Sequence, residues 1–348
     1  MDQTTVGIYL SRILSGYYIF FYRGQKYKLI YPNMDIKYEA DIYAQEEYEN
    51  NKFNDWISDD MIVDSLVSIG MWSYNGDDNI KNIEKQIEDL KVDLYQNFLN
   101  PPKLKSVRRT LNNTKNTYDK LYQIRHSLDS CTVKGYCNVL KNQYLLMHSI
   151  YDNSNNLVFN SKDADFQLLN SLASIIAENT IDLKTFRSIA RDDVWKNYWS
   201  ANNNYVFDQP TINWTDEQKT LVVLTKMYDN AYQHPECPEE KVINDDDMFD
   251  GWMILQRREH EKNKNKNRTE KLLEGKKLGK AGEIFIMANS QEEAQNIYDL
   301  NDITSRHIIK ERHSTIIGTN NDVSDSQLPD VKRNMVVQSN QQFKDTRK

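Results

Sequence analysis

The sequence predicts a mainly α-helical protein. The expected fold is a helical bundle containing an antiparallel, coiled-coil-like helical hairpin, with a small N-terminal β-hairpin and an extended C-terminal arm. Three observations predict it. Apolar residues recur at helical spacing over several long segments. The 348 residues include only 11 Gly and 7 Pro, which is few for a barrel or sandwich with many tight turns. The last segment of the chain is polar and shows no repeating apolar stripe.

The first expected domain, residues 1–56, contains the β-hairpin and an acidic helix. The segment "GYYIFFYRGQKYKLIYPN" (16–33) has two β-rich runs, with Gly24 at a position that needs a positive φ and Pro32 ending the second run. A two-stranded ribbon is marginally stable alone, so we expect it to pack on a helix or a partner. The segment "MDIKYEADIYAQEEYENNKF" that follows is expected to be helical.

The second expected domain, residues 57–150, contains the helical hairpin. Ser58, followed by two aspartates, is a suitable helix start. Two apolar stripes then flank Pro101 and Pro102, which break the pattern between them. Two amphipathic helices around such a joint predict an antiparallel hairpin of coiled-coil type. The stripes are Ile80, Ile83, Ile87, Leu90, Leu94 and Phe98, then Leu104, Val107, Leu111, Tyr118 and Leu121.

The third expected domain, residues 151–255, follows the polar loop "YDNSNNLVFNSKD". Helices are expected near 164–178 and 182–199, and Thr215 with Gln218 three residues on forms a capping box for another. Four tryptophans of this half favour a buried core over an aromatic interface, although both interpretations stay open. They are Trp195, Trp199, Trp214 and Trp252.

The fourth expected region, residues 256–348, combines a long basic helix with a polar arm. Residues 257–280 carry ten Lys or Arg against four Glu, in a chain whose net charge is −7. This stretch is the candidate partner-binding segment: it could bind an acidic protein surface or, alternatively, nucleic-acid phosphates. It has no aromatic residue for stacking on bases. The candidate contact residues are Arg257, Arg258, Lys262, Lys264, Lys266 and Arg268.

Four aspartates precede this helix, at positions 245, 246, 247 and 250. An EF-hand loop counted from Asp246 would have Met248 as its third ligand and Arg257 as its closing residue, so the calcium template fails. A two-metal nuclease site would need carboxylates from distant segments and stays open. The favoured interpretation is a helix start, where carboxylates accept backbone N–H groups and oppose the helix dipole.

The three cysteines, an odd number, indicate no disulfide framework and a reducing compartment. One metal set can be assembled, a zinc site of Cys131, Cys137, His234 and Cys237. Cys-x5-Cys is wider than usual zinc spacing, and Cys137 lies on an apolar helical stripe. Core and loop cysteines are therefore favoured, and we expect neither metal nor cofactor.

Composition and motifs also restrict the classes of function. A negative net charge disfavours coating of nucleic acid or of anionic membranes. No apolar run approaches the length of a membrane span, and no nucleophile motif is recognisable. We therefore expect a non-enzymatic protein without a membrane partner.

The order of these segments resembles that of virion-assembly proteins of contractile-tailed bacteriophages. A ribbon of the "FYRGQKYKLIYPN" kind precedes acidic helices, and a helical middle leads to "DDDMFDGWMILQRREHEKN" and a polar tail; the resemblance covers about 16–260. It implies a tail-assembly chaperone or a baseplate-hub assembly or structural protein. Such a protein binds other phage proteins in a multi-subunit assembly, in the host cytoplasm or in the virion. The alternative is a nucleic-acid-associated packaging or head/neck component that uses 257–280. These proteins have no catalytic motif, so no site residue is carried over.

Overall fold

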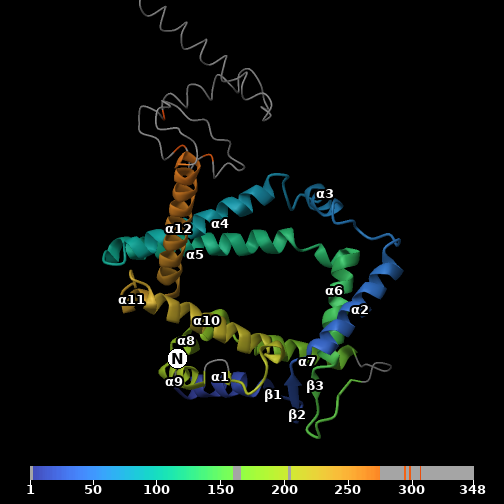
Figure 1. Ribbon diagram of the computed structural model, residues 1–348. Coiled ribbons are helices and arrows are strands. Elements are labelled where there is room, and N and C mark those ends of the chain that lie inside the picture. Colours follow the sequence, from blue (N-terminus) through green and yellow to red (C-terminus); the bar gives the residue numbers. More distant parts are fainter. Residues whose placement is uncertain are drawn as a thin grey trace, which may run out of the picture. The chain divides into compact units, whose positions relative to one another are not determined.

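The computed structural model describes residues 3–159, 166–202 and 205–274, together with Ala294, Tyr298 and Arg306. This part of the chain is mainly helical, with a small three-stranded antiparallel sheet built on the N-terminal hairpin, which confirms the predicted fold class (Figure 1). The predicted arm beyond residue 274 lies outside the described residues, apart from those three positions. The chain divides into two compact units, Met1–Ile254 and Leu255–Lys348. The four-domain division stays a prediction.

The predicted β-hairpin is present, preceded by a helix that we did not anticipate. Helix α1 (Gln3–Ser15) leads into β1 (Tyr17–Tyr22), which pairs with β2 (Gln25–Ile30) from Tyr17↔Ile30 to Tyr22↔Gln25. The two turn residues both have positive φ, 49° at Arg23 and 77° at Gly24. Positive φ at both central residues gives a two-residue turn the twist that matches its flanking strands. Gly24 therefore has the predicted conformation.

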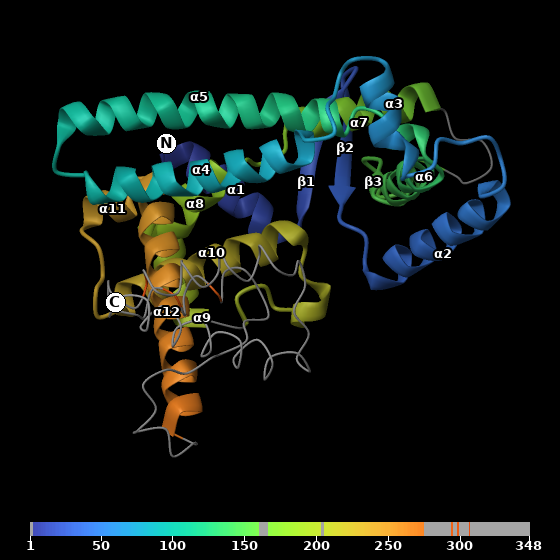
Figure 2. The same ribbon diagram turned by 90° about the horizontal axis from the view of Figure 1, so that it is seen from above.

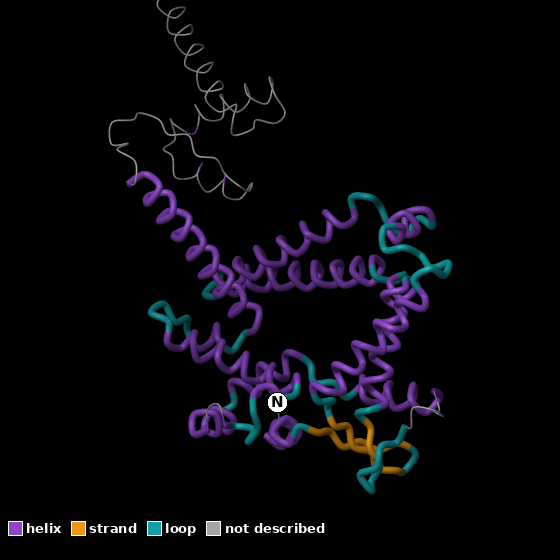
Figure 3. The backbone as a smooth tube through the Cα atoms, turned by 45° about the vertical axis from the view of Figure 1, so that its right-hand side comes forward, coloured by secondary structure: helices purple, strands orange, loops and turns teal. Residues whose placement is uncertain are grey.

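A third strand and a helix stabilise the hairpin, as expected for so short a ribbon. Strand β3 (Ile150–Tyr151) pairs antiparallel with β2, which gives the order β1-β2-β3. The strands of this small sheet are orange in Figure 3. Helix α7 (Phe166–Glu178) contributes Leu169 and Leu172 to the apolar cluster beneath the sheet. The buried strand residues of this cluster are Phe20, Tyr27, Leu29 and Ile150.

The predicted acidic helix, α2 (Met34–Asn51), packs on α6 (Val133–Met147), which follows the short 3-10 helix η1 (Asp129–Cys131). The rings of Tyr43 and Tyr144 lie 5.5 Å apart, and Asp41 forms an ion pair with Lys141. The two helices therefore touch through aromatic rings at the interface and opposite charges beside it.

The predicted helical hairpin consists of α4 (Gly76–Gln96) and α5 (Pro101–Arg125), which run side by side (Figures 1 and 2). Pro101 and Pro102 occupy the first turn of α5, where a missing N–H costs nothing, so they begin the second helix. Leu94 and Leu111 are fully buried between the helices. At the other end α3 (Met61–Ser68) packs against the hairpin. Helix α3 begins at Met61, not at the predicted Ser58.

The remaining helices of the first unit surround the tryptophan-rich core. The predicted helix 182–199 is in fact two helices, α8 (Leu183–Arg191) and α9 (Asp193–Asn202), because Asp192 is extended and its side chain accepts a hydrogen bond from the N–H of Val194. After the 3-10 turn η3 (Thr211–Asn213) follow α10 (Asp216–Gln233), α11 (Glu240–Ile243) and α12 (Asp246–Glu274). The core interpretation of the tryptophans is confirmed, since all four are buried in one cluster: Trp195, Trp199, Trp214 and Trp252.

None of the helices in the described part of the chain combines the length and apolar character that a membrane crossing needs.

The predicted capping box at the start of α10 is present and also holds α1. Thr215 accepts from the N–H of Gln218, whose Oε1 accepts from the N–H of Thr215 at 2.9 Å. The Gln218 side chain is buried, and its Nε2 donates to the carbonyl oxygen of Ile13 at 2.9 Å. One side chain therefore caps one helix and satisfies the end of another.

Replacing this glutamine tests that double role. We expect Gln218→Ala to lower the free energy of unfolding by about 1–3 kcal/mol, because it removes the side-chain hydrogen bonds to the N–H of Thr215 and to the carbonyl oxygen of Ile13. Urea unfolding of the full chain measures the change. Lys226→Ala, at an exposed position of the same helix, is the matched control. Equal stability of the two variants would contradict the assignment.

Candidate functional site

The aspartates at the start of α12 pair with cations on the helical hairpin. Asp245 Oδ2 lies 2.6 Å from Nη2 of Arg108, and Asp247 Oδ1 lies 2.6 Å from Nζ of Lys115. Both cations project from α5. Asp245 also accepts a hydrogen bond from the N–H of Met248 at 3.1 Å, so it has the predicted helix-start role.

The other two carboxylates pair with cations of α8 and α4. Asp246 Oδ1 lies 2.7 Å from Nη1 of Arg191. Asp250 lies 2.7 Å from both Nη2 of Arg187 and Nζ of Lys91. The aspartates therefore join α12 to three other helices, and the helix-start interpretation alone was incomplete. We call these four aspartates and their five cations the aspartate junction.

Burial sets the electrostatics of this junction. Burial by itself would lower the pKa of Arg187, but the neighbouring charge of Asp250 raises it above its ordinary value. Arg191 Nη1 also donates to the Tyr228 hydroxyl at 2.9 Å and to the Ile243 carbonyl oxygen at 2.9 Å. Burial raises the pKa of Tyr228 to about 12, although Arg191 opposes this shift. The phenol therefore stays neutral beside the ion pairs.

The junction also depends on a close backbone approach. A Cβ at Gly251 would lie 2.6 Å from the carbonyl carbon of Lys91, well inside van der Waals contact. Residue 251 must therefore lack a side chain for α12 to reach α4. On the same helix Met248 enters the cluster with Leu94 and Leu111, whereas Phe249 enters the tryptophan core.

Chemically, the junction is a set of ion pairs. Each carboxylate faces at least one guanidinium or ammonium group, and Nε of Arg187 is the one buried side-chain nitrogen of the described junction without a hydrogen-bond partner. Among the residues that the structure describes, no group of three His, Cys, Asp or Glu could hold a metal ion. The arrangement supports packing and alignment of helices.

The four residues considered as a zinc set, against the favoured interpretation of core and loop cysteines, do not form a possible metal-binding group in the described part of the chain. Cys131 is exposed at the end of η1, whereas Cys137 is buried in α6, where burial raises the pKa of its thiol. His234 follows α10; its Nδ1 accepts from the N–H of Glu236, and its ring lies edge-on to Trp252 at 5.5 Å. Cys237 is exposed in the loop before α11. All four are described, so the metal finding above applies to them.

The predicted partner-binding residues all lie on the part of α12 that belongs to the second unit. Arg257, Lys262 and Lys264 are exposed and Arg258 is half-buried. Arg258 and Lys262 are one helical turn apart and lie on one side of the helix. Arg257 and Lys264 are two turns apart and lie on another side, so the charges cover more than one side of the helix. The side chains of Lys266 and Arg268, and the rest of the stretch to 280, lie outside the described residues.

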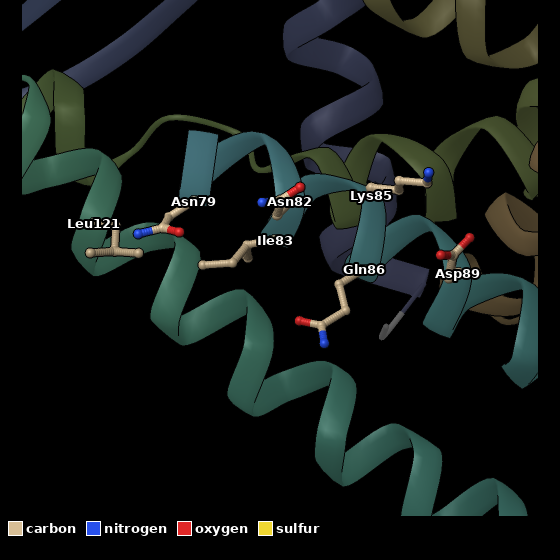
Figure 4. Close-up of a pocket in the computed structure, with 7 residues that line it drawn as sticks. All are labelled: Asn79, Asn82, Ile83, Lys85, Gln86, Asp89 and Leu121. Atoms are coloured by element: carbon tan, nitrogen blue, oxygen red, sulfur yellow. The ribbon is translucent and has the colours of Figure 1, made fainter. Parts of the chain in front are cut away.

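An open groove of about 380 Å³ lies along the helical hairpin (Figure 4). Amide and charged side chains of α4 surround it, and its apolar part is formed by Ile83 of α4 and Leu121 of α5. The remaining lining residues are Asn79, Asn82, Lys85, Gln86 and Asp89. Its volume is at the low end of ligand pockets, and its exposure is more typical of a helix–helix surface.

A row of exposed apolar side chains lies on α2. Met34, Tyr38 and Ile42 follow one another at spacings of four residues and are 48%, 67% and 43% exposed. The opposite side of the helix, with buried Ala40, faces α6. We call these three residues the α2 stripe. The sequence does not reveal this stripe, because the tyrosines of the helix fall on more than one side.

Sequence reasoning also missed the cationic half of the aspartate junction. Arg187 and Arg191 are four residues apart on a strongly amphipathic helix, beside buried Phe186 and Ile189. That spacing was a usable signal for two cations on one flank. Lys91 carries no comparable local signal.

Neither a protein-family model, a curated protein nor a solved structure matches the chain.

A methyl group at position 251 tests the close approach in the junction. We expect Gly251→Ala to lower the free energy of unfolding by about 1–3 kcal/mol, because the new Cβ pushes α12 away from Lys91. Gly7→Ala is the matched control, since Gly7 is helical and has open space around it. It should raise stability by about 0.5–1 kcal/mol. Thermal or urea unfolding measures both stability changes. A change of the same sign in the two variants would refute the close contact at residue 251.

The raised pKa of Tyr228 predicts a loss of stability in alkali. In the unfolded chain a tyrosine ionises near 10.0, whereas folded Tyr228 ionises at about 12. The contribution of neutral Tyr228 to the free energy of unfolding is therefore complete below pH 10 and is lost as the pH rises through 12. Tyr228→Phe should be less stable at neutral pH, because it loses the bond from Arg191, yet should lose less stability over this window. Unfolding measured from pH 8 to 12 tests this, with Tyr232→Phe on the same helix as control.

Proposed function

We propose that the chain is a non-enzymatic, protein-binding component of virion assembly in contractile-tailed bacteriophages, of the tail-assembly chaperone or baseplate-hub type. It acts by presenting fixed surfaces to other phage proteins. The α2 stripe is the observation that carries the protein-binding part of this proposal. The phage part comes from the resemblance of the segment order.

The α2 stripe has the features of a partner-binding helix surface. Its spacing of four residues forms one continuous row, the pattern of anchors in helix-in-groove recognition. Because the other side of α2 packs on α6 through Ala40 and Tyr43, and the Asp41–Lys141 ion pair lies beside this interface, the stripe lies on an ordered helix. Asp35 and Glu46 are exposed on the same helix, so a matching groove would be apolar with a basic rim.

Exposed aromatic residues elsewhere in the first unit support the same class of function. Phe53, Tyr74 and Tyr205 are all exposed. Tyrosine and phenylalanine are enriched in protein interfaces, because a ring provides large contact area at small entropic cost. Several small surfaces of this kind suit a protein with more than one partner.

The alternative function is that of a nucleic-acid-associated packaging or head/neck component. The exposure of Arg257, Lys262 and Lys264 on α12 favours it. DNA or RNA binding that weakens steeply with salt, and that disappears on deletion of 257–280, would support this alternative. DNA or RNA binding that persists after the deletion would not support it.

Removing the α2 stripe tests the proposed function. We expect the triple substitution Met34→Ser, Tyr38→Ser and Ile42→Ser to reduce partner retention at least about tenfold, because hot-spot residues carry most interface energy. Tagged chain is purified from cells that assemble particles, and bound phage proteins are quantified by mass spectrometry.

Val223→Ser, at an exposed apolar position of α10, is the control and should retain partners. Undiminished retention by the folded triple variant would count against the α2 stripe. Mass spectrometry of finished particles beside assembly intermediates then separates a structural part, present in both, from a chaperone, present only in intermediates.

A further inference from the structure

Strand β1 forms an open edge of the small sheet. In the part of the chain that the structure describes, the strand order β1-β2-β3 leaves one side of Tyr17–Tyr22 without a neighbouring strand (Figure 2). The six-residue pairing with β2 is regular and has no bulge. The backbone on the open side is therefore straight enough to accept another strand.

The hydrogen-bond pattern identifies which backbone groups face outward. In a hairpin closed by a two-residue turn, the flanking residues Tyr22 and Gln25 exchange hydrogen bonds, and bonded pairs alternate from there. An independent bond confirms this alternation, because the N–H of Ile30 donates away from β1, to the carbonyl of Ser149 at 2.8 Å. The N–H and C=O groups of Ile19 and Phe21 therefore point to the open edge. Among the described residues, no backbone group bonds to them.

The edge also lacks the usual protection against strand pairing. Natural edge strands are commonly blocked by a charge, a proline, a bulge or a covering segment. The sequence of β1, YYIFFY, contains no charge and no proline. Ile19 and Phe21 are 39% and 68% exposed on the outer side of the sheet. An unprotected apolar edge of this kind is a template for an added strand.

The outer side of the sheet is cationic. Lys28 lies directly across from Ile19, with its Nζ 4.2 Å from the centre of the Tyr17 ring, and Lys26 lies across from Phe21. From residue 16 to 33 the sequence contains no Asp or Glu. This contrasts with the net charge of −7 of the whole chain.

We propose that the open edge of β1 binds an extended segment of a partner protein in which acidic and apolar side chains alternate. This inference rests on the proposed protein-binding function and adds the chemistry of one partner segment. The outward groups of Ile19 and Phe21 supply main-chain hydrogen bonds. The acidic side chains lie on the outer side, within reach of the long side chains of Lys26 and Lys28.

A second copy of the chain fits this edge less well. Antiparallel pairing of two β1 strands would place both sets of Lys26 and Lys28 on one side of a joined sheet without a carboxylate between them. Like charges on one surface oppose that pairing. An acidic segment of another protein removes the conflict.

A synthetic strand tests the inference on the full chain. The probe is a labelled peptide of about six residues, an average strand length, in which glutamate and valine alternate. We expect saturable binding by fluorescence anisotropy, and binding at least about tenfold weaker when lysine replaces glutamate. Failure of the glutamate peptide to bind would overturn the proposal.

Methylation of the peptide amides provides the decisive comparison. In antiparallel pairing, the residue opposite Ile19 shares its side of the sheet and exchanges both hydrogen bonds with it, so the glutamate amides face β1. N-methylation of the glutamates should then weaken binding at least about tenfold, whereas methylation of the valines should not. The reverse result indicates parallel addition and also supports the proposal. Equal effects of the two patterns would refute it.

Ile19→Pro tests the edge from the side of the protein. Its outward N–H makes no bond to β2, so proline removes no ladder hydrogen bond and should leave the helical circular dichroism unchanged while abolishing peptide binding. If this variant does not fold, the methylated peptides still decide with the unaltered chain.

Two outcomes separate this inference from its alternatives. The triple variant of the α2 stripe should bind the peptide normally; partner retention through α2 without peptide binding would refute only the β1 proposal. An oligothymidylate probe that binds in place of the peptide, and is lost in Phe21→Ala, would assign the surface to single-stranded nucleic acid instead.

Discussion

The aspartates at the start of α12 are half-buried between helices, and each has a cationic partner on α4, α5 or α8. A half-buried carboxylate left without its partner destabilises the fold, so the cations favour the arrangement in which each aspartate is paired. Met248 and Phe249, neighbours in α12, enter two different apolar clusters. The ion pairs therefore align the point where the helical hairpin meets the tryptophan core. Ion pairs that must form together favour one arrangement of the helices over others that would bury similar apolar area.

A second polar cluster joins the tryptophan core to the sheet. Arg12 of α1 forms an ion pair with Glu217 of α10, donates to the Asn179 carbonyl at 2.8 Å, and stacks over Tyr18 at 4.2 Å. Burial would lower the pKa of Arg12, but its bond to Tyr31 and the charge of Glu217 raise it. Several modest apolar clusters are thus connected by charged groups whose geometry is specific. This suits a chain whose surface is large relative to its apolar content.

Local sequence patterns predicted most of the helices and turns. They could not predict strand pairs and ion pairs between residues that are distant in the sequence. Gly24, the Pro101–Pro102 joint and the Thr215 cap follow from steric and hydrogen-bond rules that act within a few residues. Strand β3 has two residues and no strand pattern, so only its pairing with β2 defines it. The partners of the aspartates lie more than fifty residues away in sequence, which no periodicity reveals. The open edge of β1 likewise depends on strand order, because a hairpin sequence does not tell which side stays unpaired.

The separation of β3 from β2 along the chain has a consequence for synthesis. β2 ends at Ile30, and β3 begins at Ile150. At ordinary translation rates, the ribosome needs on the order of ten seconds to make the intervening segment. Throughout that interval both edges of the nascent hairpin have no paired strand. The apolar residues beneath it are not yet covered by α7. A β-hairpin forms in microseconds, so the time needed to synthesise β3 is far longer than the time in which β1 and β2 can pair. Neighbouring ribosomes on one message would hold several such hairpins close together, which makes early engagement by a chaperone or a binding partner advantageous for the yield of folded protein.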